Sequence, residues 1–94
     1  MQPPHAVSFS GDLDIWKEEE VDARLATIDG SAPVLIDLSA VRYLDSAFLS
    51  ALIRLRRRIP DSPITIVVEV PSVRRIFSIT QLDQLFEIVP FRPD

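Results

Sequence analysis

The clearest pattern in the chain is a pair of short apolar runs separated by an amphipathic stretch. Val34 to Leu38 and Ile64 to Val70 are rich in branched apolar residues, which is typical of buried strands. Between them, from Ser46 to about Ile59, apolar residues cover a broad arc at helical spacing, and Ser50 and three arginines take the opposite arc. Strand, helix and strand in this order predict a parallel βαβ unit.

Shorter patterns extend this unit in both directions along the chain. The expected elements are a strand at 6–10 ended by Gly11, a helix at 18–28 closed by Gly30, a turn and second extended piece at 37–44, a helix from Pro71, a capping box at 80–83 and a strand at 87–89. Trp16 lies off the apolar stripe of its helix and is expected to pack at the helix entrance. The pattern predicts one α/β domain over 1–94, a small sandwich with a mostly parallel central sheet and helices mainly on one face, and loose ends at 1–5 and 91–94.

Composition narrows the classes of function. The 94 residues are 47% hydrophobic and carry a formal net charge of -4, which favours a folded domain and argues against nucleic acid as the partner. The chain contains no cysteine, so it has neither a disulfide framework nor a thiolate metal site. No apolar run approaches the ~20 residues of a membrane span, and the first residues lack the features of a signal peptide. We therefore expect a soluble cytoplasmic protein without membrane insertion.

The strongest candidate for chemistry is the hydroxyl of Ser46. A strand delivers it to the first turn of a helix, where unpaired N–H groups and the helix dipole favour negative charge. Serine is also a preferred helix cap, and Asp45 is an alternative cap. Capping and phosphorylation are compatible, so both interpretations of Ser46 stay open.

Two acidic residues follow successive strands and are expected at the same end of the sheet. Asp14 and Asp45 as a carboxylate pair would suit acid–base catalysis or a metal, but loop acids that form a partner surface are the favoured interpretation. His5, the only histidine, lies near a loose end, so nothing fixes a triad with Ser46. The chain has no glycine-rich phosphate loop. We expect no catalytic residues, no cofactor and no metal.

The segment VLIDLSAVRYLDSAFLSAL, residues 34–52, resembles the central motif of STAS domains, the family of the anti-sigma factor antagonists. There, a strand ending in Asp-Leu-Ser precedes a hydrophobic segment, and Asp-Ser or Asp-Thr then starts a helix. The segments 11–14 and 73–77, with Thr80 and Leu82-Asp83, are similar to other family motifs. The resemblance covers about residues 7 to 90.

This resemblance implies a bacterial regulatory function rather than an enzyme. The serine after the aspartate is the phosphorylation site of the antagonists, and the matching residue is Ser46. By resemblance, the unphosphorylated protein binds an anti-sigma factor with serine kinase activity and releases a sigma factor. Phosphorylation ends the interaction, and a serine phosphatase restores it. The implied partner-binding face is Asp14, Asp45, Ser46, Ala47, Phe48 and Ser50.

The chain departs from the family pattern at three points. Phe48 stands where a glycine usually follows the phosphorylated serine, and a ring there would block a kinase or bind a different partner. Gln81 stands at a later glycine position. A missing first strand would leave a sheet edge open, which predicts a homodimer. Two alternatives stay open: a non-switching structural subunit of a lipid-transport ATPase complex or stressosome-like assembly, and a domain that binds a nucleotide or lipid.

Overall fold

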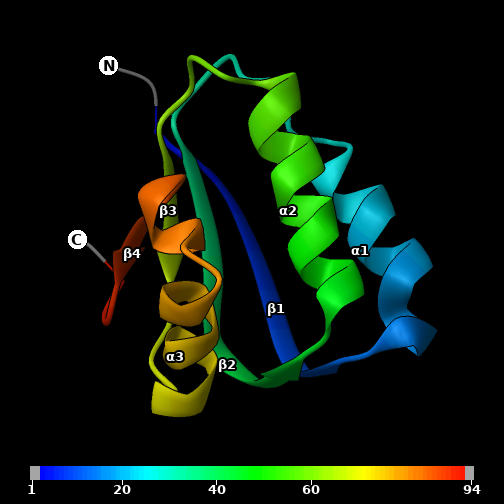
Figure 1. Ribbon diagram of the computed structural model, residues 1–94. Helices are drawn as coiled ribbons and strands as arrows, with labels where there is room; N and C mark the ends of the chain where they lie inside the picture. Colours follow the sequence, from blue (N-terminus) through cyan, green and yellow to red (C-terminus); the bar gives the residue numbers. More distant parts are fainter. Residues whose placement is uncertain (1–2, 93–94) are drawn as a thin grey trace.

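Four parallel strands form the central sheet in the order β1-β2-β3-β4 (Figure 1). The computed structural model describes residues 3–92. The elements are β1 (His5–Leu13), a 3-10 turn η1 (Ile15–Lys17), α1 (Glu18–Leu25), β2 (Val34–Leu44), α2 (Ser46–Arg58), β3 (Ile64–Val67), α3 (Pro71–Ile79), a second 3-10 turn η2 (Leu82–Gln84) and β4 (Glu87–Val89). Within the described residues, the predicted α/β class and parallel βαβ unit are confirmed.

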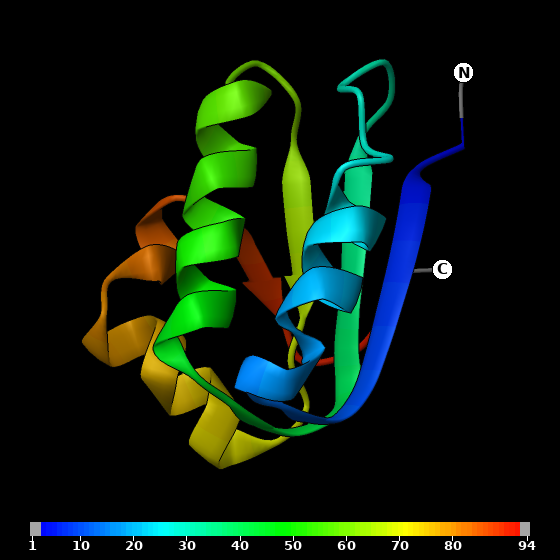
Figure 2. The same ribbon diagram turned by 90° about the vertical axis from the view of Figure 1, so that its right-hand side faces the viewer.

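The helices cover one face of this sheet. Figure 2 shows α1 and α2 side by side in front of β1 to β3, with α3 beside them toward β4. Apolar side chains of the strands and the three helices form one buried cluster, in which Ile36, Leu52, Ile66 and Phe77 are fully inaccessible. This one-sided layering was predicted. Across residues 3–92, no helix has both the length and the apolar character needed to span a membrane.

β2 is one long strand, so the turn predicted at 37–44 is wrong. The Asp37 carboxylate accepts the N–H of Ser39 at 2.9 Å, and the pairing with β1 shifts at this point. Ser8 lies opposite Asp37, but Ser10 lies opposite Ala40, so β2 holds one extra residue. The turn-forming residues therefore make a β-bulge, because the local hydrogen bond bends the strand without ending its pairing.

Other predicted boundaries also shifted. β1 continues through Gly11, which has φ +77°, to Leu13. α1 ends at Leu25 rather than Ile28, because Arg58 of α2 donates to the carbonyls of both residues and the Thr27 hydroxyl donates to Arg24. Gly30 does adopt the left-handed conformation, but it lies in the loop after the helix and is not its cap. β3 ends at Val67 instead of Val70.

The capping box predicted at 80–83 is absent. The Thr80 hydroxyl donates to the Ile76 carbonyl at 2.7 Å, so it closes α3 and does not cap the next turn. Gln81 then takes φ +63°, the only positive φ of a non-glycine residue in the described chain. This conformation explains why glycine suits the position.

The ends differ from the predicted loose segments. His5 already belongs to β1, and its N–H donates to the Pro33 carbonyl at 2.8 Å. Near the other end, the Arg92 guanidinium lies 3.5 Å from the Asp37 carboxylate. Of the other predicted loose residues, Pro3, Pro4 and Phe91 are exposed and belong to no helix or strand, and 1–2 and 93–94 lie outside the described residues.

Candidate functional site

The carboxyl ends of β1 and β2 place two acidic caps side by side. Leu13 pairs with Leu44, and the Asp45 N–H donates to the Leu13 carbonyl at 3.2 Å. The next residues along each strand are Asp14 and Asp45, so the parallel register itself brings them together. The prediction that they share one end of the sheet is confirmed.

Asp45, rather than Ser46, caps α2. Its Oδ1 accepts the Phe48 N–H at 3.1 Å, and its backbone is extended as expected for an N-cap. Ser46 is the first helical residue and is exposed, and its hydroxyl makes no hydrogen bond to another described residue. Asp45 thus performs the capping that a serine could perform here. This leaves the Ser46 hydroxyl free at the positive end of the helix.

Asp14 plays the same part after β1. Its Oδ1 accepts the Trp16 N–H at 3.1 Å and so opens η1. Trp16 itself is 90% exposed. The prediction that its ring packs at the helix entrance is therefore wrong, because the 3-10 turn directs the side chain away from the core.

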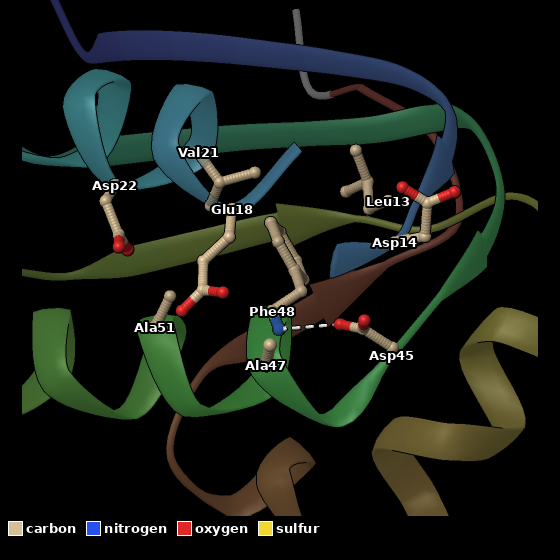
Figure 3. Close-up of a pocket in the computed structure, with 9 residues that line it drawn as sticks. All are labelled: Leu13, Asp14, Glu18, Val21, Asp22, Asp45, Ala47, Phe48 and Ala51. Carbon is tan, nitrogen blue, oxygen red and sulfur yellow. Dashed lines mark hydrogen bonds between the residues drawn. The ribbon is translucent and has the colours of Figure 1, made fainter. Parts of the chain in front are cut away.

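A cleft between the first turns of α1 and α2 joins these residues (Figure 3). It is lined by Leu13, Asp14, Glu18, Val21, Asp22, Asp45, Ala47, Phe48 and Ala51. Four of these nine residues are acidic, so the mouth of the cleft is negative. Its water-accessible space is about 10 Å³, room for no more than about one water molecule. The cleft therefore suits contact with a protein surface better than enclosure of a small molecule.

Phe48 is part of the core beneath the site. Its side chain is 3% exposed, and its ring meets that of Phe9 edge-on, with centroids 5.6 Å apart. Figure 3 shows the ring turned from α2 toward the interior, away from the start of the helix. The ring therefore does not cover the hydroxyl of Ser46, contrary to the blocking role considered from the sequence. The side chain is also not available as part of a docking face.

The remaining predicted residues divide between the cleft and the outer surface of α2. Ala47 lines the cleft beside Asp14 and Asp45. Ser46 and Ser50 are both exposed and lie one helical turn apart. His5 begins β1, whereas Ser46 follows the end of parallel β2, so the two lie toward opposite ends of the sheet and form no triad.

Three exposed apolar residues at this end were missed as site candidates. Ile15 and Trp16 follow Asp14 and are 64% and 90% exposed, and Tyr43, two residues before Asp45, is 52% exposed. Exposed apolar groups rimmed by charge are typical of protein contacts. The sequence feature that could have indicated this exposed group was the position of Trp16 outside the apolar stripe.

Comparisons with known proteins agree with this geometry. The family described as "Mlab, STAS domain" matches residues 2–90. A crystal structure of an anti-sigma factor antagonist from Mycobacterium paratuberculosis is similar, with a TM-score of 0.82 and 28% sequence identity. The match covers 92% of this chain and 76% of that chain.

Proposed function

Since the chain belongs to the STAS domain family, we propose that it is an anti-sigma factor antagonist switched by phosphorylation of Ser46. In its unphosphorylated form it binds an anti-sigma factor that has serine kinase activity. The partner transfers phosphate to Ser46 and releases the protein, and a serine phosphatase restores the binding form. The cycle takes place in the cytoplasm, and this chain acts by binding and not by turnover.

The observation that carries the proposal is the free hydroxyl of Ser46. Asp45 already caps α2, so modification of Ser46 removes no cap and leaves the helix intact. The side chain is exposed and stands where unpaired N–H groups of the first turn would face the phosphate. A kinase can therefore reach Ser46 without unfolding α2.

The charges and apolar groups around Ser46 support a change in partner affinity. Phosphorylation adds roughly -1.5 to -2 charge at pH 7, close to Asp45 and the acidic cleft. A partner that packs on Ile15, Trp16 and Tyr43 must present apolar surface nearby. Burial of a phosphate against such a surface costs desolvation energy, so the phosphorylated protein is released. The proposed docking face keeps Asp14, Asp45, Ser46, Ala47 and Ser50, and Phe48 supports it from beneath.

Intact-mass measurement during incubation with ATP and a candidate anti-sigma factor kinase tests the modification. We expect one added phosphate, which is absent in Ser46→Ala and retained in Ser50→Ala. Ser50 is the matched control because it is exposed on the same helix one turn away. A serine phosphatase should return the original mass.

Affinity for the same partner tests the switch. Ser46→Asp should weaken binding by about tenfold or more, an effect of ~1.4 kcal/mol or greater, whereas Ser50→Asp should change it less. Trp16→Ala should weaken binding without changing unfolding, because the ring makes little contact with the fold. A stable complex that never acquires phosphate and tolerates Ser46→Asp would instead identify a non-switching structural subunit.

A further inference from the structure

The outer edge of β1 has no strand partner in the described chain. β1 ends the sheet and pairs only with β2. In a parallel ladder, the N–H and C=O groups of every second residue point to the same neighbouring strand, and those of the residues between them point to the opposite side. The His5 N–H donates toward β2, to Pro33, so Val7 and Phe9 also face β2. The N–H and C=O groups of Ala6, Ser8 and Ser10 therefore face outward.

The strand itself lacks the features that usually protect an edge, and the charged side chains nearest to it, Lys17, Glu20 and Arg24, come from η1 and α1. Natural edges carry charges, prolines or bulges. Residues 6–10 include neither a charge nor a proline, and the register shift beside Ser8 comes from the extra residue in β2, so β1 stays regular. The side chains of Ala6, Ser8 and Ser10 are small and exposed. A five-residue window of the edge is thus open to backbone pairing.

Features of the chain on both sides limit the length of this window. Pro3 and Pro4 precede it and have no N–H to donate. Beyond it, Gly11 takes φ +77°, and the Lys17 ammonium lies 3.5 Å from the position that a Cβ on Gly11 would take. A pairing strand is therefore confined to residues 6–10.

We propose that this edge binds a second copy of the chain by antiparallel pairing centred on Ser8. The outward groups are symmetric about that residue. With Ser8 opposite Ser8 of the second copy, Ala6 of each chain lies opposite Ser10 of the other, and every outward N–H and C=O finds a partner. The segment is thus complementary to itself, and pairing joins the two sheets into one.

The proposed dimer leaves the carboxyl-end sites free. Because the two strands run antiparallel, the Ser46 of each copy lies toward the opposite end of the joined sheet. This inference does not depend on the proposed function, since it uses only the amino-terminal half of β1. Failure to detect phosphorylation of Ser46 would not affect the dimer proposal. Failure to detect the dimer would not affect the proposed phosphorylation.

Cross-linking through one introduced thiol tests the register. The chain contains no cysteine, so Ser8→Cys adds the only thiol. Opposed residues of a hydrogen-bonded pair have Cα atoms about 5.5 Å apart, within the range of a disulfide. Mild oxidation of Ser8→Cys should therefore yield a covalent dimer.

The matched control is Ala6→Cys, whose two thiols would lie four residues apart along the paired strands, about 13 Å. It should not cross-link alone, but a mixture of Ala6→Cys and Ser10→Cys should cross-link the two different chains. Equal cross-linking of Ser8→Cys and Ala6→Cys, or no cross-linking of Ser8→Cys, would overturn the proposal.

Sedimentation of the unmodified chain over a range of concentrations provides an independent measurement. Ser8→Pro removes an outward N–H that the fold does not use, so the monomer should stay folded by circular dichroism. It should weaken the dimer by about tenfold or more relative to Ser8→Ala, which keeps the N–H. A protein that remains monomeric at all concentrations, or a dimer equally stable with Ser8→Pro, would show that β1 is not the contact.

Discussion

The two ends of the sheet use charged side chains in different ways. At the amino ends of the strands, two arginines of α2 donate to backbone carbonyls of neighbouring loops. At the carboxyl ends, the Asp14 and Asp45 side chains cap η1 and α2, and the rings of Trp16 and Tyr43 remain exposed. Charge therefore joins loops to the fold at one end, whereas at the other it caps single helices beside exposed groups that are available to a partner.

The amino end is held by arginines of α2 that donate both to a distant loop and to the loop that follows their own helix. Arg58 donates to the Leu25 and Ile28 carbonyls, and Arg56 donates to those of Ile59 and Ser62 at 2.7 and 2.6 Å. Arg56 and Arg58 of the α2 arginine cluster therefore have a structural role near the end of the helix. The Arg56 guanidinium binds carbonyls and does not simply extend into water.

The largest predicted effect lies at this amino end. Arg56→Met should lower the free energy of unfolding by about 2 kcal/mol, because the carbonyls of Ile59, Ser62 and Leu85 lose a charged donor. Urea denaturation followed by circular dichroism measures the loss. Arg57→Met is the matched control: Arg57 is exposed on the same turn, and its replacement should change stability by no more than ~0.5 kcal/mol. Equal losses would mean that the carbonyl contacts contribute little.

The same contrast explains which features the sequence could predict. Apolar periodicity located the strands, the three helices and the buried stripe of α2, because burial depends mainly on local spacing. The junction of β2 and α2 was equally local, since its cap is three residues from the N–H that it binds. The sequence therefore located Ser46 at the first turn of a helix.

Features that depend on distant contacts could not be predicted from local patterns. α1 stops early because Arg58, about thirty residues away, binds the carbonyl of its last residue, Leu25, and that of Ile28 in the following loop. Asp37 and Ser39 resemble a turn locally, but pairing with β1, which resumes at Ala40, keeps the strand continuous. Burial of Phe48 against Phe9 likewise required knowing which strand faces the first turn of α2.

An intermediate effect is expected at the carboxyl end. Asp45→Ala should lower the free energy of unfolding by about 1 kcal/mol, because the Phe48 N–H loses its cap. Asp45→Asn keeps a capping oxygen and should recover most of that stability. Ser46→Ala should be close to neutral, because its hydroxyl caps nothing. Thermal unfolding of the three variants measures the order, and a greater loss for Ser46→Ala than for Asp45→Ala would assign the cap to the serine.

The smallest effect concerns a second aspartate turn, at the amino end. The Ser31 hydroxyl and the Ser31 backbone N–H hold the pKa of Asp29 below its ordinary value of 3.8. A lowered folded-state pKa adds stability above the ordinary value, and that stability is lost as the pH falls through the lowered pKa. Ser31→Ala should move the pKa of Asp29 toward 3.8, and its small destabilisation at pH 7 should shrink below about pH 4.

An NMR titration of the Asp29 carboxyl group measures this change directly. The backbone N–H remains in the variant, so the pKa should rise only part of the way. An unchanged pKa would show that the hydroxyl does not stabilise the carboxylate. Because Asp29 is fully exposed, water screens its contacts, and the shift should be visible in the titration while global stability barely moves. An aspartate turn in open solvent thus orders a loop locally, whereas the half-buried Asp45 holds the start of a core helix.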